Sequence, residues 1–501
     1  MHIHRQSIAG RLLVVAVSFF ALCIAPSAES MAAAPRPNIL FCISDDQSWL
    51  HTSAMGDPVV KTPAFDRVAE EGILFTHAFC DAPSCGPSRS SILTGQHIWR
   101  LEDAANIHSR LPDKFPTYVG LMEKAGYAVG SYQKAWSPGK FKTPTGWVHN
   151  SQTKLNPAGT HFKSFAEFHR QKPKGKPFCF WLGSFDAHRG YKRDSGIESG
   201  MDPAKVVVPA HLPDDPIVRR DILDYYFEVQ RFDRLVGSAL DVLEEAGELD
   251  NTLVVVTSDN GMPFPRAKAT LYDFGTRMPL AIRWPAKIVS PGRKYDSFVH
   301  LSDLSPTFLE AAGLKPPRQM TGRSLMDIFT EEKPADRDAA YTAMERHDGC
   351  RKGGKGYPCR AIRTRDFLYI RNYEPTRWPS GDPDPNNCAR AIPFGEVDSS
   401  PTKTLMMEKG AEPGFRQLHQ LSFAVRPAEE LYDMRTDPDQ IKNIAAESDY
   451  ADARRKLADR LHNYTAKTGD PRALGLDAPW DYLPYYGWQK TKGWAVDKRP
   501  E

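Results

Sequence analysis

The chain has 501 residues, which is enough to bury a large core and suggests two or more domains. Basic and acidic residues nearly balance, and the formal net charge is +3, so the charge of the whole molecule gives no reason to expect nucleic acid as a partner. Aromatic residues make up 11% and prolines number 41, which is typical of a folded, loop-rich protein and excludes a largely disordered chain.

The first 34 residues have the layout of a secretory signal peptide. Histidines and arginines come first, the apolar run 12–24 follows, and small residues continue to Ala34. The alternative is an uncleaved membrane anchor, but the apolar run is short for a membrane span. We therefore expect an exported protein, periplasmic or secreted, with no stable membrane insertion after the signal is cleaved.

Four continuous apolar runs come next, and each is followed at once by polar residues. Such runs are typical of strands buried on both faces, and helical segments lie between them. We predict strands at 38–43, 127–132, 177–183 and 252–257, and helices at 63–71, 115–125, 217–245 and 304–312. The sequence thus predicts an α/β fold with a large, mostly parallel sheet flanked by helices.

Polar residues at the ends of these strands are expected to meet, because ligands of such folds bind beyond the carboxyl ends of the strands. They are Asp45 and Asp46 after the first strand, Lys134 after the second, Asp186, His188 and Arg189 after the third, and Asp259 and Asn260 after the fourth. Either acidic pair alone would more often be a turn or a helix cap. Together they form an oxygen-only set that suits calcium or magnesium rather than zinc or iron.

The segment from Cys85 to Gly95 has the features of a short helix that begins at a reactive residue. Pro87 suits the first turn, and Gly95 can end the helix. Cys85 would then lie at the helix N-terminus, where free N–H groups favour an anion, with Arg89 projecting to the same side. The usual alternative is a buried cysteine before an ordinary helix. A nucleophile that holds an anion beside a fixed guanidinium suits a sulfate or phosphate ester.

Beyond a charged, proline-containing stretch at 328–337, the composition indicates a second unit. Strands are expected at 341–345 and 360–373, and an amphipathic helix at 451–465. We therefore divide the chain into a signal peptide (1–34), a main domain (35–330) and a smaller C-terminal α+β domain with an antiparallel sheet (331–501).

Eight cysteines are present, without the CxxC or Cys/His spacing of a zinc site. Export permits disulfides. Cys350 and Cys359, across a glycine-rich loop, are the pair that we expect, and Cys388 is a competitor. Cys42 and Cys179 lie in apolar runs and are expected to be buried free thiols.

The order Cys85-Gly-Pro-Ser-Arg89, followed by Thr94-Gly95, resembles the signature of type I, formylglycine-dependent sulfatases. The resemblance implies an alkaline-phosphatase-like fold with a catalytic main domain and a C-terminal domain that contributes to the substrate pocket. It implies that a formylglycine-generating maturase oxidises Cys85 to formylglycine (3-oxoalanine). One hydroxyl of the hydrated aldehyde would attack sulfur and the other would later expel sulfate, which is covalent catalysis in two steps.

The resemblance also implies one calcium ion and a set of basic residues around the sulfate. The ligands would be Asp45, Asp46, Cys85, Asp259 and Asn260. Lys134 and Lys268 match positions that bind sulfate oxygens, and His188 would protonate the departing oxygen. Taken alone, each would more often be a solvated lysine or a structural histidine. The candidate catalytic residues are thus Cys85, Arg89, Lys134, His188 and Lys268.

Within the sulfatases the chain looks most like the heparan N-sulfatase (sulfamidase) branch, through segments 208–214 and 258–265 and through Asp186 beside His188 and Arg189. Two residues depart from that pattern. Trp136 stands where a histidine is usual, and Lys268 stands where this branch has arginine. Because arginine and lysine are not interchangeable at an anion site, an O-sulfated sugar is at least as good a candidate as an N-sulfated one.

From Glu345 to Arg377 there are nine basic residues against four acidic ones, with aromatic residues between them. Such a segment suits a sulfated polysaccharide through charge pairing and ring stacking, and a solvated basic face is the alternative. The candidate substrate-binding residues are Asp186, Arg189, Glu345, Arg346 and His347.

We predict a sulfatase that hydrolyses sulfate esters, or N-sulfate, of a sulfated carbohydrate. One alternative is a phosphatase or phosphonate monoester hydrolase on the same scaffold, whose relatives usually have a serine or threonine nucleophile and two zinc ions. The other is a secreted glycan-binding protein with a decayed site, of which Trp136 would be the only visible sign.

Overall fold

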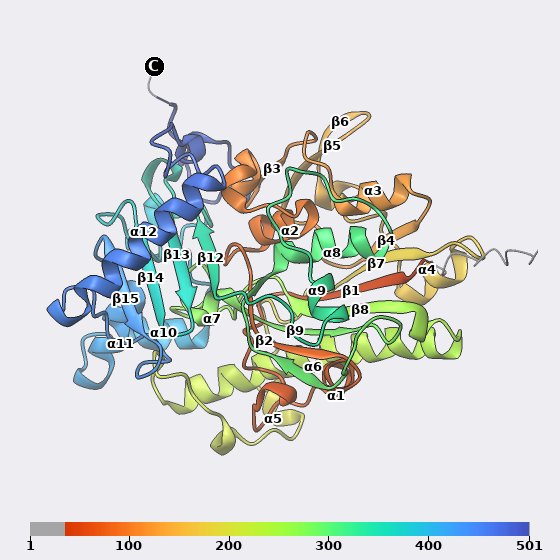
Figure 1. Cartoon of the computed structure of the whole chain (residues 1–501). Helices are drawn as coiled ribbons and strands as arrows, with labels where there is room; N and C mark the ends of the chain where they lie inside the picture. Colours follow the sequence, from red (N-terminus) through yellow and green to blue (C-terminus); the bar gives the residue numbers. More distant parts are fainter. Residues whose placement is uncertain (1–35, 500–501) are drawn as a thin grey trace, which may run out of the picture. The chain divides into compact units, whose positions relative to one another are not determined.

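The computed structural model describes residues 36–499, so the predicted signal peptide lies outside the described residues. Within that range no helix combines the length and the apolar character that crossing a bilayer requires. A mixed eight-stranded sheet forms the centre (Figure 1). Its strands are β1 (Asn38–Ser44), β2 (Ile73–Phe79), β4 (Ala128–Tyr132), β7 (Phe178–Gly183), β8 (Thr252–Ser258), β9 (Arg277–Arg283), β10 (Arg293–Tyr295) and β11 (Val299–His300).

The four strands predicted from apolar runs lie side by side in the order β4-β7-β1-β8, and all four are parallel. Ile39 of β1 lies opposite Cys179 of β7 and Leu253 of β8. The next strand, β9, runs antiparallel to both β8 and β2, so the sheet is mixed toward that edge. Since parallel strands end at the same edge, the polar residues after these four strands are brought together.

Helices cover both faces of the sheet. On one face lie α1 (Pro63–Glu70), α4 (Phe165–Gln171) and α6 (Pro216–Glu245), and on the other lie α2 (Cys85–Thr94), α3 (Tyr118–Lys124), α8 (Leu304–Ala311) and α9 (Met326–Thr330). Successive side chains of β1 alternate between the two apolar clusters, Leu40 in one and Phe41 in the other. Both faces of the strand are therefore apolar, which explains the uninterrupted run. The predicted α/β class is confirmed.

A three-stranded sheet that the sequence did not predict lies at the carboxyl edge of the main sheet. It consists of β3 (Ser109–Leu111), β5 (Gly139–Thr143) and β6 (Gly146–His149). Two one-turn helices, α5 (Ser195–Glu198) and α7 (Asp273–Thr276), belong to the loops around the main sheet.

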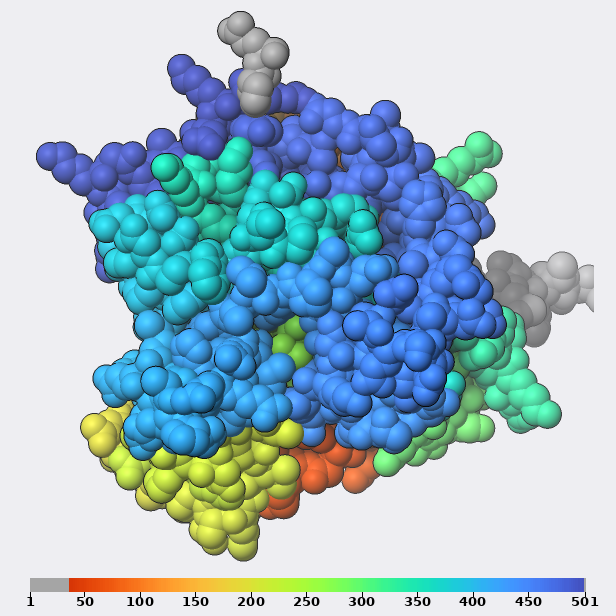
Figure 2. Space-filling view, turned by 90° about the vertical axis from the view of Figure 1, so that its left-hand side faces the viewer, coloured from red at the N-terminus to blue at the C-terminus, as the bar shows by residue number. Residues whose placement is uncertain are grey.

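The predicted C-terminal antiparallel sheet is present. Its strands are β12 (Ala339–Met344), β13 (Cys359–Thr364), β14 (Phe367–Asn372) and β15 (Glu429–Asp433), in that order. The helices of this part are α10 (Pro401–Glu408), α11 (Pro413–Phe423) and α12 (Ala451–Lys467). Leu457 and Leu461 of α12 pack against the sheet. Figure 2 shows this side, where the cyan to dark blue part of the chain covers most of the face in view.

The seven described cysteines are buried free thiols. The Sγ atoms of Cys350 and Cys388 lie 2.7 Å apart. Cys359 instead lies on β13 opposite Met344 and belongs to an apolar cluster. The neighbour of Cys350 is thus the competitor Cys388, and the expectation of Cys359 was wrong because β13 directs that side chain into the core.

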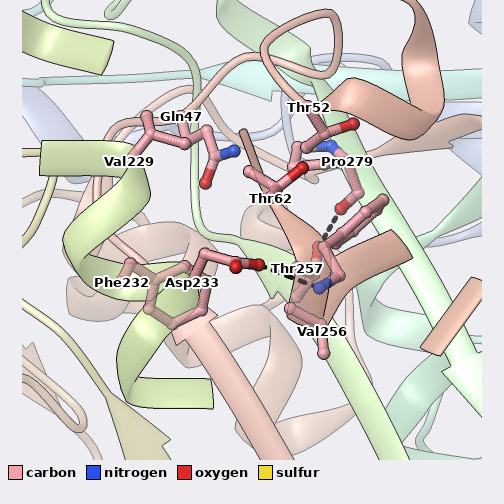
Figure 3. A pocket seen from close by; sticks show the side chains of 10 residues that line it. Gln47, Thr52, Thr62, Val229, Phe232, Asp233, Val256, Thr257 and Pro279 are labelled. Carbon is pink, nitrogen blue, oxygen red and sulfur yellow. Dashed lines mark hydrogen bonds between the residues drawn. The ribbon is translucent and has the colours of Figure 1, made fainter. Parts of the chain in front are cut away.

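A small cavity lies between the main sheet and helices α1 and α6 (Figure 3). Its volume is about 10 Å³, no more than one water molecule needs. Asp233 of α6 lines it and accepts hydrogen bonds from the backbone N–H groups of Ala64 (3.0 Å) and Phe65 (2.8 Å). Asp233 thereby caps α1, whose own N-cap residue, Thr62, makes no side-chain cap. Burial raises the pKa of Asp233 to about 6.

Asp233→Ala is expected to lower the free energy of unfolding more at acidic pH than at neutral pH. In the folded protein the pKa of Asp233 is about 6, against a usual value of 3.8, so the folded chain binds this proton more tightly than the unfolded chain. The wild type therefore gains stability relative to the variant as the pH falls from about 7 to about 4. Urea unfolding of both proteins across this range measures the difference, and a pH-independent difference would contradict the expectation.

Candidate active site

Cys85 begins α2, and the helix ends at Gly95, which adopts the left-handed conformation (φ 63°) that the sequence predicted for a helix stop. Every residue of α2 is buried. The sulfur of Cys85 lies 3.4 Å from Asp45 Oδ1 and 3.7 Å from Asp46 Oδ1. Burial, and then the charge of Asp45, raise the pKa of the Cys85 thiol well above its usual value. The unmodified group is therefore a protonated thiol and a weak nucleophile.

Three carboxylates gather around this sulfur. Asp45 and Asp46 follow β1, Asp259 follows β8, and one ligand atom from each, with the sulfur of Cys85, lies within 4.8 Å of the others. Asn260 adds an amide, whose Nδ2 donates to Asp46 Oδ1 (2.7 Å) while its buried Oδ1 accepts no hydrogen bond. An orphaned buried oxygen beside three carboxylates fits a hard divalent cation. The donor set thus suits the predicted metal site.

Arg89 connects this cluster to the neighbouring strand ends. Its Nε donates to Asp259 Oδ2 at 2.7 Å, and its terminal nitrogens donate to the carbonyls of Lys134 (2.6 Å), Ala135 (2.9 Å) and Ser44 (3.2 Å). The guanidinium is fully buried and does not line the pocket described below. Arg89 therefore positions the groups around Cys85 rather than facing a ligand.

Two buried lysines pair with the carboxylates after β1. Lys134 forms an ion pair with Asp45, and Lys268 contacts Asp46 (2.7 Å) and Asp398 (3.1 Å). Burial alone would lower the pKa of each lysine, but the carboxylates outweigh it and raise the pKa of both above the usual value. Both ammonium groups are therefore charged at neutral pH and suit the oxygens of an anion.

His188 stands at the edge of the same cluster. Its Nδ1–H donates to the carbonyl of Arg189, which leaves Nε2 as the free ring nitrogen, 3.8 Å from Asp46 Oδ2. About a third of the side chain is exposed, and it lines the pocket. A partly exposed imidazole with one free nitrogen is placed for proton transfer with a group bound in the pocket.

A cavity of about 450 Å³ opens onto Cys85, within the usual range of small-molecule sites. Its lining includes the predicted residues Asp45, Lys134, His188 and Lys268. A second group of lining residues consists of His108, His149, His347, Asp348, Arg390, Asp398, Tyr485 and Trp488. Sequence analysis predicted only His347 of this second group. His149 ends β6, and the others lie in loops without a catalytic motif. The one sequence signal among them is the density of aromatic residues in the last 25 positions, which include Tyr485 and Trp488.

Glu345 and Arg346 do not line this pocket, contrary to the expectation that they contact a sugar. Glu345 is buried and pairs with Arg360 (2.7 Å) and Arg472 (2.7 Å). Arg346 is buried too and donates to the backbone carbonyls of residues 483 and 484. These contacts connect the four-stranded antiparallel sheet (β12–β15) to the C-terminal segment.

Asp186 and Arg189 also lie outside the lining of this pocket. Arg189 forms a two-point ion pair with Asp221 (2.7 and 2.9 Å) and donates to the carbonyl of Pro263. The nearest basic group to Asp186 is that of Arg231, at 3.6 Å. Both expected sugar contacts are thus engaged with the protein itself.

Trp136 and four of the nine basic residues at 345–377 are buried as well. Trp136 is buried in the core and donates its indole N–H to Ser90 Oγ at 2.9 Å. Four arginines of the basic segment form ion pairs with carboxylates elsewhere, namely Arg351 with Glu396, Arg360 with Asp470, Arg363 with Asp273 and Arg377 with Asp481. The charge of these four is neutralised within the fold, whereas Lys352, Arg365 and Arg371 are exposed.

A protein-family model described as Sulfatase matches residues 37–314, more than half of the chain. A second model, described as N-sulphoglucosamine sulphohydrolase, C-terminal, matches residues 266–387.

Two curated relatives align with nearly the whole chain. An Ulvan-active sulfatase of Formosa agariphila is 26% identical over 518 residues, which cover 93% of this chain and 82% of the relative. The N-sulphoglucosamine sulphohydrolase of Homo sapiens is 28% identical over 489 residues, which cover 89% of this chain and 93% of the relative.

Solved structures with a similar fold include a protein in complex with its substrate D-glucosamine-2-N,6-O-disulfate. Its TM-score is 0.62 at 21% identity, covering 87% of this chain and 98% of that one. A phosphonate monoester hydrolase from Silicibacter pomeroyi has a TM-score of 0.63 at 18% identity, covering 87% of this chain and 96% of that one. At these identities the likeness concerns the fold alone.

Glu345→Gln is expected to lower the free energy of unfolding by about 3 kcal/mol, because it removes the charge that two buried arginines share. Glu374→Gln is the control, since Glu374 belongs to a partly exposed ion pair whose loss should cost less than about 1 kcal/mol. Denaturant unfolding of both variants measures the two values. An equal loss of stability in the two variants would mean that Glu345 does not hold the four-stranded antiparallel sheet (β12–β15) to the C-terminal segment.

Proposed function

The chain belongs to the sulfatase family, and we propose that it is an exported sulfatase that releases sulfate from a sulfated carbohydrate. The observation that carries this proposal is the arrangement at Cys85, where a helix N-terminus, three carboxylates and two charged lysines meet at one pocket. The likeness to an Ulvan-active sulfatase and to N-sulphoglucosamine sulphohydrolase supports a carbohydrate as the carrier of the sulfate. Export rests on the signal-like sequence of residues 1–34.

Cys85 would act after conversion to formylglycine by a maturase. Two observations support this: its position matches the family signature, and its buried thiol has a pKa well above the usual value, which does not suit the unmodified side chain to attack. The hydrate of the aldehyde would supply the attacking hydroxyl. Asp45 and Asp46, whose carboxylate oxygens lie beside the sulfur, are placed to accept protons from such a hydroxyl.

Asp45, Asp46, Asp259 and Asn260 would hold one calcium ion together with the modified residue. Calcium suits a site of carboxylate and amide oxygens, and it would supply positive charge to a sulfate oxygen. The charge of the site supports this choice. Four carboxylates, including Asp398, surround three basic groups, which leaves one net negative charge. A divalent cation changes this to one net positive charge, which attracts an anion.

The basic residues would divide the remaining work. Lys134 and Lys268 lie on the pocket wall and would bind the outer oxygens of the sulfate. His188 would give a proton from Nε2 to the departing oxygen or nitrogen of the sugar. Arg89, which is buried among protein acceptors, would hold Asp259 in place. Lys268 supports an O-sulfated substrate, whereas the likeness to N-sulphoglucosamine sulphohydrolase supports an N-sulfated one. The experiment below therefore compares both substrates.

Cys85→Ala is expected to lower sulfate release by about 10⁴-fold or more, because the nucleophile is lost. The protein is produced with a maturase and incubated with N-sulfated and O-sulfated glycans, and free sulfate is measured by ion chromatography. Cys359→Ala, which removes a buried thiol that belongs to an apolar cluster and not to the carboxylate cluster, is the control and should keep its activity. Undiminished release by Cys85→Ala would overturn the proposed mechanism.

The glycan from which sulfate is released shows which bond the enzyme cleaves, the N–S bond of an N-sulfate or the O–S bond of an O-sulfate. Release from N-sulfoglucosamine ends would mean that Lys268 serves an N-sulfate as well as arginine does. Release only from O-sulfated glycans would mean that Lys268 marks a change of specificity.

Removal of calcium is expected to lower the unfolding temperature and to stop sulfate release. At a calcium concentration about 100 times the dissociation constant, binding adds about 2.7 kcal/mol of stability, which corresponds to several degrees. Asp259→Asn should abolish this shift. Asp81→Asn is the control, because Asp81 belongs to a second buried cluster with His97 and His300. Thermal unfolding with calcium and with EDTA tests both variants, and loss of the shift in Asp81→Asn alone would assign the ion to that other cluster.

A further inference from the structure

Strands β3, β5 and β6 form a small sheet (Figure 1), and His149 at the end of β6 lines the pocket, so this sheet borders it. Its register places Arg110 opposite Lys140, Lys140 opposite His149, and Lys142 opposite Trp147. Paired residues, and residues two apart on one strand, lie on the same face of a sheet. Arg110, Lys140, Lys142, Trp147 and His149 therefore share one face, which we call the basic face.

The opposite face of this sheet is apolar. Leu111 and Phe141 belong to the main core, and Val148 packs against it. The basic face is therefore the side that is turned away from the core, and 38% of Trp147 is exposed on it. His149, at its end, also lines the pocket that opens onto Cys85. The basic face thus continues the wall of the pocket outward.

Two cations of the basic face have no carboxylate partner. Among residues 36–499, Arg110 and Lys140 take part in no ion pair, and the buried Nε of Arg110 donates no hydrogen bond. They lie against aromatic rings instead. Lys140 Nζ is 4.2 Å from the ring centroid of Tyr486, and the guanidinium carbon of Arg110 is 5.3 Å from the same centroid and 5.1 Å from that of Trp147. Their charge remains available to an anion.

Lys142 differs, because it pairs with the exposed Asp113 at 3.4 Å. An exposed pair of this kind is weak. Four arginines of the basic segment at 345–377, by contrast, pair with carboxylates. Among the described residues, Arg110 and Lys140 therefore place unpaired positive charge beside His149, which lines the pocket.

The C-terminal segment links the basic face to the pocket mouth. The backbone N–H of Tyr486 donates to the carbonyl of His108 at 2.8 Å, which fixes this segment beside β3. Two residues on, Trp488 lines the pocket and is 77% exposed. Exposed indole rings therefore occur both at the pocket mouth and on the basic face, where Trp147 lies beside Arg110.

We propose that the basic face binds the saccharide unit next to the one that is desulfated, and that this unit carries a sulfate or carboxylate group. Arg110 and Lys140 would pair with the anionic group, and the ring of Trp147 would offer its apolar surface to the sugar ring. The occupant is thus the continuation of an anionic polysaccharide or oligosaccharide chain. This inference rests on the proposed function, because it concerns the same substrate.

The test uses the double variant Arg110→Gln/Lys140→Gln. Its substrates are a sulfated monosaccharide and a sulfated tetrasaccharide with the same terminal unit. The ratio of the tetrasaccharide KM to the monosaccharide KM should rise about tenfold relative to the wild type, because two charge-assisted contacts to the second unit are lost. Added salt should raise the tetrasaccharide KM more in the wild type than in the variant. Thermal unfolding checks that the variant is folded.

The control is Lys174→Gln/Lys176→Gln. These exposed lysines lie in the loop before β7, at the edge of the sheet opposite to the pocket, and removing them lowers the net charge by the same amount. Their removal should leave the KM ratio unchanged. An unchanged ratio in Arg110→Gln/Lys140→Gln, or an equal rise in the control, would overturn the inference.

Failure of the proposed function would be recognised separately, because the wild type would then release no sulfate from either substrate. In that case the dissociation constant of the tetrasaccharide, measured by calorimetry, decides the matter. Weaker binding by Arg110→Gln/Lys140→Gln than by the wild type would support the basic face as an anionic-glycan site. Equal binding by the two proteins would overturn it.

Discussion

The geometry of the site depends on the buried guanidinium of Arg89. From one turn inside α2 it binds Asp259 after β8, the carbonyl of Ser44 at the end of β1, and the carbonyl of Lys134 after β4. A buried guanidinium is costly unless each donor finds a partner. The three strand ends are therefore held at fixed positions around Cys85. The positions of the carboxylate cluster and of the two lysines thus depend on this one side chain.

The sequence was sufficient for the main sheet and for the groups nearest to Cys85. β1, β4, β7 and β8 are apolar on both faces, so each appears as an unbroken run whose predicted ends agree with the structure to within a residue. Parallel strands also end at one edge. That rule alone brings Asp45 and Asp46 to Asp259 and Asn260, although more than two hundred residues separate the two pairs.

The outer part of the site could not be predicted, because it depends on pairings between distant segments. Glu345 lies two residues before the pocket residue His347 in the sequence. Its carboxylate pairs with Arg360, which also binds Asp470, so the charge of Glu345 is neutralised inside the fold. Asp398 reaches Lys268 from a loop with no periodic pattern. Composition signals a basic segment, but only the structure tells which of its charges are neutralised and which remain free.

The burial of Cys85 in the folded protein limits when this residue could be modified. In the folded protein only 1% of this residue is exposed, and every residue of α2 around it is covered. Under the proposed conversion to formylglycine, a modifying enzyme would have to act before α2 packs, because the folded chain covers the cysteine. The yield of active protein would then depend on the rate of modification relative to the rate of folding, and slower folding would increase the modified fraction.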